Sequence, residues 1–361
     1  MSPRNRILPV FIPHRGCPHA CVFCNQHEIT ACAAEAGETA AFPEADPLTE
    51  MNRLLSLPPD GTVRELAFYG GSFTALPAAE QLRFLEPAAE ALEGGRISSI
   101  RLSTRPDAID RETLDRLRRF GVGTVELGAQ SMRDGVLALA GRGHSAQAVR
   151  EASALIREAG FRLVLQMMTG LPGDDDEGAV FTARELIVLR PDAVRIYPTV
   201  VVRGTRLAED WRAGKYREHT VEDAVRVCAR ILPLFEEAGI PVIRLGLNPT
   251  EELSGGAALA GAYHPALGEL VRSRILRNRA EELLNGKAAP GGAVTLLVPP
   301  GQLSQMVGQH RGNVLWLRER FALRKLTVRP DPGGTGLRAL FDSSIPSPSG
   351  GNEREESHYG L

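Results

Sequence analysis

Seven short apolar segments alternate with longer amphipathic segments between residues 7 and 246. The apolar segments are rich in Val, Ile and Leu and show little polar alternation, which is typical of parallel strands buried on both faces. They lie at 7–13, 65–70, 99–104, 124–129, 162–168, 193–198 and 241–246. The amphipathic segments predict helices at 78–93, 110–120, 145–159, 176–189 and 221–238.

Repeated strand–helix units predict a parallel sheet with right-handed crossovers. The number of units, about six, favours an α/β fold with a partial (β/α)6 TIM-like barrel over residues 1–250. Polar and Gly-rich segments such as GGS, STRPD, GAQS and TGLPGD follow the predicted strands. Barrel enzymes carry their chemistry at the carboxyl ends of the strands, so we expect the functional site there.

The remaining residues predict a second, smaller unit. Residues 251–284 predict a linker and an Arg-rich helix, and residues 285–331 read as strand, helix, loop, helix and strand, a small α+β domain. Residues 332–361 are rich in Ser, Pro, Gly and Glu, which predicts a disordered tail.

Composition indicates a cytoplasmic protein with reduced thiols. No apolar run approaches the ~20 residues of a membrane span, and the N-terminal apolar run is too short for a secretion signal. In the cytoplasm a tight cysteine cluster indicates metal binding or catalysis rather than a disulfide. The formal net charge of −2 means that any basic surface for nucleic acid must be local.

The segment HRGCPHACVFCNQ holds Cys17, Cys21 and Cys24 in a CxxxCxxC pattern. A zinc site usually needs four protein ligands, and a second cysteine pair is missing. Three histidines could supply the fourth ligand: His14, His19 and His27. A redox pair of Cys21 and Cys24 leaves Cys17 unexplained. A [4Fe-4S] cluster bound by three thiolates uses all three and leaves one iron open, so the pattern favours it, with zinc as the alternative.

These motifs resemble those of the radical S-adenosylmethionine (radical SAM) superfamily, whose signature is CxxxCxxC with an aromatic residue, here Phe23, before the last cysteine. The resemblance covers residues 7–250. It implies a [4Fe-4S] cluster whose open iron binds S-adenosylmethionine (SAM), and a reducing electron donor such as flavodoxin or ferredoxin. One electron then cleaves SAM to a 5′-deoxyadenosyl radical, which takes a hydrogen from the substrate.

The resemblance also implies SAM contacts beyond the cysteines. YGGSFTAL, at 69–76, resembles the superfamily element that binds the SAM amino group, and a plain Gly-rich turn is the alternative. Similarity to the subgroup of anaerobic coproporphyrinogen oxidase and the elongator catalytic subunit places Arg142 at the SAM carboxylate. The full implied set is Gly70, Gly71, Ser72, Ser103, Gln130, Arg142 and Gln166. Ser72, Ser103 and Gln166 depart from the residue types that are common in the family.

Residues 196–216 closely resemble the elongator catalytic subunit, which starts carboxymethylation of the wobble uridine in tRNA. Tyr197, Arg203 and Thr205 match that segment, and a strand end with a capped helix is the alternative interpretation. The relative has a wider first cysteine spacing and an acetyltransferase domain, for which this sequence has no motif. The resemblance implies RNA, tRNA in particular, as the substrate.

The small unit resembles a KH module, which clamps single-stranded nucleic acid at a GxxG loop. In VGQHRGNVLWL, Gly308 is kept and Arg311 replaces the second glycine. Nearby Arg318 and Arg324 belong to a locally basic segment that suits RNA, and a solvated charged face is the alternative. Two other functions stay open: a small-molecule enzyme resembling anaerobic coproporphyrinogen oxidase, and a non-catalytic RNA-binding protein with a zinc knuckle.

Overall fold

The computed structural model describes residues 5–17, 21–25, 46–58, 60–250, 253–342 and 356–358. The chain divides into two compact units, one reaching to Pro265 and the other beginning at Ala266 and including Cys228–Arg230. The boundary therefore lies after the predicted position at 250. Residues beyond 250 stay with the first unit because β9 (Ala258–Gly261) pairs antiparallel with β7 (Val200–Val202).

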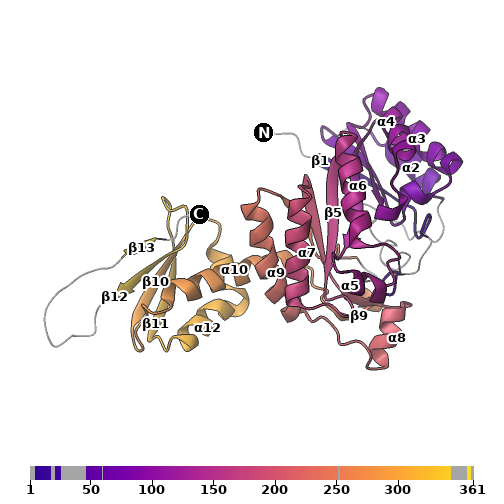
Figure 1. Ribbon diagram of the computed structural model, residues 1–361. Helices are drawn as coiled ribbons and strands as arrows, with labels where there is room; N and C mark the ends of the chain where they lie inside the picture. The colour runs from indigo at the N-terminus through magenta and orange to yellow at the C-terminus, as the bar shows by residue number, and fades with distance from the viewer. Residues whose placement is uncertain are drawn as a thin grey trace, which may run out of the picture. The chain divides into compact units, whose positions relative to one another are not determined.

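The first unit is built on a seven-stranded sheet in the order β1-β2-β3-β4-β5-β6-β8, and every neighbouring pair is parallel (Figure 1). The strands are β1 (Asn5–Phe11), β2 (Val63–Tyr69), β3 (Ser99–Thr104), β4 (Val122–Gln130), β5 (Arg162–Thr169), β6 (Ala193–Pro198) and β8 (Val242–Leu245). All seven predicted strands are present, and the fold is a curled, partial barrel as expected. The strand order follows the chain order because each crossover returns to the adjacent position.

The five predicted helices are also present. They are α3 (Ala78–Glu93), α4 (Arg111–Arg119), α6 (Ala146–Glu158), α7 (Asp176–Val188) and α9 (Val221–Glu237). Ser145 caps α6 by accepting a hydrogen bond from the backbone of Ala148, and α6 packs against β4 and β5 (Figure 1). Three shorter helices lie outside the predicted set: α2 (Pro47–Leu55), α5 (Asp134–Leu139) and α8 (Arg206–Arg212).

The two faces of the sheet differ in polarity because side chains alternate along each strand. On β4, Val125 and Leu127 are fully buried hydrophobic residues, whereas Glu126 between them is a fully buried carboxylate. Arg101 on β3 and Arg195 on β6 reach Glu126 on the same face of the sheet and donate hydrogen bonds to it. The sheet therefore has an apolar face and a face whose middle is charged.

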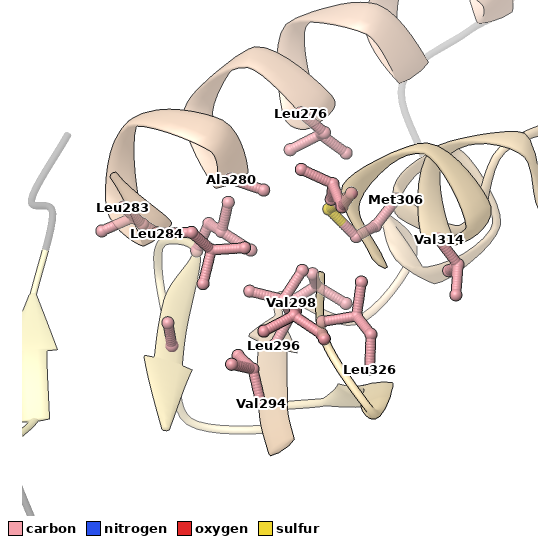
Figure 2. Packing of buried hydrophobic residues seen from close by; sticks show 14 residues of the cluster. Leu276, Ala280, Leu283, Leu284, Val294, Leu296, Val298, Met306, Val314 and Leu326 are labelled. Atoms are coloured by element: carbon pink, nitrogen blue, oxygen red, sulfur yellow. The ribbon is translucent and has the colours of Figure 1, made fainter. Parts of the chain in front are cut away.

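The second unit begins with α10 (Leu267–Leu284). The strand–helix–loop–helix–strand order predicted for it is present as β10 (Ala293–Val298), α11 (Leu303–Val307), the 3-10 turn η4 (Gln309–Arg311), α12 (Gly312–Arg320) and β11 (Lys325–Pro330). Figure 2 shows its core, in which Leu276, Ala280 and Leu284 of α10 face Leu296 and Val298 of β10. This core belongs to the second unit alone, so α10 is part of its fold rather than a linker.

The prediction that residues 332–361 form a disordered tail is wrong for two strands. β12 (Arg338–Asp342) pairs antiparallel with β10, and β13 (Glu356–His358) pairs with β12. The physical reason is the apolar segment LRALF, in which Leu337 and Ala339 are buried in the core of the unit. None of the helices that the structure describes is long and apolar enough to cross a bilayer.

Candidate active site

A cavity of about 490 Å³ in the first unit is lined by residues from all seven strands of its parallel sheet. Every one of the predicted site residues lines it: Cys17, Cys21, Cys24, Gly70, Gly71, Ser72, Ser103, Gln130, Arg142 and Gln166. These residues are spread over 150 positions of the sequence. The parallel sheet brings them together because the carboxyl ends of its strands meet at one edge.

The turn from Cys21 to Cys24 is held from two sides through Val22. The Val22 backbone donates to the Ala140 carbonyl at 3.1 Å and accepts from the Leu207 backbone at 2.7 Å. Phe23, the predicted aromatic signature, packs against a small apolar cluster that includes Met168 and Leu171. The histidines considered as zinc ligands at 19 and 27 lie outside the described residues. Within the described ranges no group of three or more His, Cys, Asp or Glu side chains is arranged to hold a single metal ion.

The Cys17 loop is fastened to the GGS segment by backbone contacts. His14 donates to the Gly70 carbonyl at 2.9 Å, and Ser72 donates to the Arg15 carbonyl at 2.8 Å. A Cβ on Gly71 would lie 2.5 Å from the carbonyl oxygens of Arg15 and Ile12. Gly71 therefore allows the two loops to pack closely, because any larger residue would collide with the backbone. The sequence motif alone did not indicate this structural role.

Two guanidinium groups lie near the cysteine thiols. Arg142 Nη1 is 3.1 Å from Cys21 Sγ. The pKa of the Cys17 thiol is raised overall, first by desolvation and then by the neighbouring Cys21, although Arg105, Arg142 and a hydrogen bond from Ser72 oppose the rise. A positive environment stabilises thiolates, which are the form that binds metal. The donor set of three cysteines with adjacent cationic side chains thus fits a cluster with thiolate ligands.

The end of β4 is shaped to present polar atoms to the cavity. A β-bulge separates Gly128 from Gln130, and Gln130 adopts a left-handed conformation with φ of 65°. Arg142 Nη2 donates to the Gly128 carbonyl at 2.7 Å, which fixes the guanidinium beside the bulge. Such conformations carry strain and cluster at binding sites.

Two buried oxygens at this end lack hydrogen-bond partners among the described residues, Gln130 Oε1 and Ser103 Oγ. Buried polar atoms are nearly always paired in native proteins. A bound ligand with polar groups would satisfy both, so these atoms fit the predicted SAM site.

Glu126 is the main site residue that sequence reasoning missed. Its carboxylate accepts hydrogen bonds from Arg101 Nη1 at 2.7 Å, Arg195 Nη2 at 3.0 Å and Gln166 Nε2 at 3.0 Å. Tyr69 also donates to it at 3.2 Å. Burial raises the pKa of the Tyr69 hydroxyl, and the Glu126 charge adds to the rise, so this hydroxyl stays protonated. The available signal was a charged residue in the middle of an otherwise apolar strand.

His144, in the GRGH segment, was also missed as part of the site. Its Nε2 lies 3.3 Å from the Ala129 carbonyl. Burial, with the Arg142 charge second, lowers the pKa of His144 to about 4, so the imidazole is neutral at pH 7 and donates from Nε2. Arg105 Nη2 donates to the Arg142 backbone carbonyl at 2.7 Å. Both residues hold the GRGH segment (141–144) against the sheet.

Sequence comparison identifies two matching family models, and together they extend over most of the chain. The radical SAM superfamily model matches residues 11–186. The radical SAM C-terminal domain model matches residues 191–277.

Curated relatives share about 30% identity. Elongator complex protein 3 of Schizosaccharomyces pombe is 30% identical over 263 residues, covering 62% of this chain and 48% of the relative. The human protein of the same name is 29% identical, covering 58% and 41%. The tRNA uridine(34) acetyltransferase of Methanocaldococcus jannaschii is 28% identical, covering 45% and 34%. The chain thus spans less than half the length of these relatives.

Among solved structures, Elp3 of Methanocaldococcus infernus has a similar fold, with a TM-score of 0.57 and 22% identity, covering 77% of this chain and 64% of that one. Radical SAM enzymes use a [4Fe-4S] cluster and SAM, and the cavity residues described above suit both. From the two matching models, the shared fold and this cavity, it follows that the chain is an enzyme of the radical SAM superfamily.

Proposed function

We propose that this enzyme modifies RNA, with tRNA as the leading substrate, by removing a hydrogen atom from it. The observation that carries the proposal is the gathering of all predicted cluster and SAM residues around one cavity. The printed names of several relatives add support, since one is a tRNA uridine acetyltransferase. The cytoplasm is the compartment that we propose, with flavodoxin or ferredoxin as the electron donor.

Cys17, Cys21 and Cys24 are the proposed cluster ligands. When bound, the cluster supplies one electron to SAM and thereby the radical that removes the substrate hydrogen. The protein's own part is to fix the loop that holds the sulfurs and to place positive charge beside them. The Gly71 contact with the Cys17 loop serves the first task, and Arg142 beside Cys21 serves the second.

SAM is proposed to lie between the GGS segment and the end of β4. Gly70, Gly71 and Ser72 would meet its amino group, and Arg142 its carboxylate. Ser103 Oγ and Gln130 Oε1 are buried and lack partners among the described residues, so they can receive further SAM groups. Gln166 can offer its Oε1 and the second hydrogen of its Nε2 to SAM, because one Nε2 hydrogen already goes to Glu126.

The second unit is proposed to hold RNA. Arg318 and Arg324 are exposed, and neither has a carboxylate within ion-pair distance among the described residues. His310 and Arg311 adopt left-handed conformations in the loop after Gly308, which makes a tight exposed turn. Exposed guanidinium groups without counter-charges attract phosphate.

The loop also has an anchor. The Asn313 side-chain nitrogen donates to the Ser273 carbonyl at 3.0 Å, to Ser273 Oγ at 2.9 Å and to the Gln305 carbonyl at 3.1 Å. The turn that presents Arg311 is thereby fixed on α10. A fixed turn loses less conformational entropy on binding, which supports a recognition role.

The test is anaerobic turnover of the reconstituted full chain with bulk tRNA, measuring release of 5′-deoxyadenosine. We expect tRNA to increase the rate and Cys24→Ala to abolish it with loss of bound iron. Cys228→Ala, at a buried cysteine of α9, is the control and should keep its iron. Arg318→Met combined with Arg324→Met should weaken tRNA binding and its dependence on salt. Release that tRNA leaves unchanged, together with no tRNA binding at low salt, would exclude RNA as the substrate.

A further inference from the structure

A row of polar side chains, which includes the predicted SAM residue Gln166, crosses the inner face of the sheet. Glu126, Gln166, Arg195 and Arg244 come from four successive strands of the sheet, β4, β5, β6 and β8. Gln166 is in register with Arg195, and Arg195 is in register with Arg244. Residues in register on adjacent strands lie on the same face with their side chains in reach of each other.

The charges along this row do not balance. Arg101 forms ion pairs with both Glu65 and Glu126 at 2.7 Å, and Arg195 forms one with Glu126. Arg244 has no carboxylate within ion-pair distance among the described residues. Its Nε donates to the Gly246 carbonyl at 2.9 Å, and its two terminal nitrogens have no hydrogen-bond partner within the described ranges. The row therefore carries one positive charge in excess.

Arg244 is half-buried and lines the cavity together with Tyr197 and Asn248. Arg195 Nη1 donates to the Tyr197 hydroxyl at 3.5 Å, which leaves the hydroxyl proton able to bond to a ligand. Burial lowers the pKa of Arg244, and Arg195 contributes in the same direction. A guanidinium nevertheless stays protonated in proteins. A desolvated charge of this kind favours a bound counter-ion.

This position is separate from the predicted SAM contacts. Six of the seven predicted SAM residues lie on β3 or β4 or in the segments after β2 and β4, and Arg244 lies on β8, three strands beyond β4. The seventh, Gln166 on β5, is two strands from β8. At about 4.8 Å per strand spacing, Arg244 is about 14 Å along the sheet from β4 and about 10 Å from β5. The excess charge thus belongs to another part of the cavity from that of the SAM carboxylate.

We propose that Arg244 and the Tyr197 hydroxyl bind an anionic oxygen group of the substrate, a phosphate or a carboxylate, at the β8 side of the cavity. The inference rests on the proposed function only in taking this cavity as the place where substrate enters. Two terminal guanidinium nitrogens form a fork that matches either anion in a bidentate manner. A nucleotide phosphate is the source that an RNA substrate would supply.

The test is calorimetric titration of the full chain at low salt with uridine monophosphate, uridine, malonate and malonamide. We expect at least one anion to bind ten-fold or more tightly than its neutral analogue. Preference for the nucleotide identifies a phosphate, and preference for malonate identifies a carboxylate. Arg244→Met should remove the preference, and Arg244→Lys should keep part of it.

Arg83→Met, at an exposed arginine of α3, is the matched control and should bind as the unchanged protein does. Tyr197→Phe gives a second route if Arg244→Met fails to fold, and it should reduce anion binding several-fold. Equal binding of charged and neutral ligands, or full binding by both variants, overturns the proposal. Turnover that does not respond to tRNA would overturn the RNA proposal instead and leave these affinities unchanged.

Discussion

Glu126→Gln tests whether the buried carboxylate holds the inner face of the sheet together. The side chain is 0% exposed and accepts hydrogen bonds from Arg101, Arg195, Gln166 and Tyr69. The substitution keeps the shape and removes the charge. Arg101 keeps Glu65 as a second partner, whereas Arg195 loses its carboxylate.

Removing one partner of a buried ion pair costs about 3–5 kcal/mol, because the remaining charge stays desolvated. A first unit of this size loses roughly 2–4 °C in melting temperature per kcal/mol. We therefore expect a decrease of roughly 6–20 °C, and a lower urea midpoint with an unchanged slope.

The matched control is Glu65→Gln, since Glu65 is partly exposed and Arg101 keeps Glu126. It should cost about 1 kcal/mol or less. The double variant Glu126→Gln with Arg195→Met should recover part of the loss, because it removes the stranded charge. The reasoning fails if the free energy of unfolding of Glu126→Gln lies within 1 kcal/mol of that of the parent protein. The Arg195 charge would then be better solvated than the structure indicates.

Three further predictions concern separate parts of the chain. Gly71→Ala should displace the Cys17 loop, since its Cβ would meet two carbonyl oxygens at 2.5 Å. Iron uptake after reconstitution should then fall well below that of a Gly135→Ala control, where the φ is likewise not positive and the space around the Cβ is open. Because the pKa of His144 is about 4 in the folded protein and about 6.5 in the unfolded chain, the unfolded chain binds more protons between these values. The contribution of His144 to the free energy of unfolding is therefore fully present above pH 6.5 and declines as the pH falls toward 4, by roughly 3 kcal/mol in all. His144→Gln should make the urea midpoint depend less on pH over this range. Asn313→Ala should destabilise the second unit by about 1–3 kcal/mol, because the Ser273 and Gln305 acceptors lose their shared donor, and unchanged urea unfolding of that unit would show that water replaces the amide.

The strands were predictable because each is a continuous apolar segment between turn signals, and the same physics buries them in the sheet. The helix α5 (Asp134–Leu139) was not, because six residues give too few turns for a periodic pattern. α8 was expected only in the alternative interpretation of residues 196–216, as a capped helix after a strand end. Its Thr205 cap accepts from the Ala208 backbone in the structure, so the local signal was present.

The candidate site divides in the same way. Cysteines and glycines at fixed spacing are local patterns, and the structure places them around one cavity. The contacts of Glu126 join residues 25 and 69 positions away, and such partners follow from strand register rather than from sequence spacing. The sequence alone cannot show that Arg244 lacks a carboxylate partner, because its neighbours in space are known only from the structure. Its unbalanced positive charge was therefore not predictable.

The seven-stranded sheet of the partial barrel has two outer strands, β1 and β8. In the described part of the chain, each of them has a strand neighbour on one side. Their outward backbone groups depend on water or loops rather than on a ladder. Amide exchange should therefore be fastest at these two margins and slowest at β4, in the centre of the sheet. Exposed isoleucines mark both margins, Ile7 at 42% and Ile243 at 45%. The centre of the sheet, where Glu126 pairs with two arginines, is thus expected to open less often than the two outer strands.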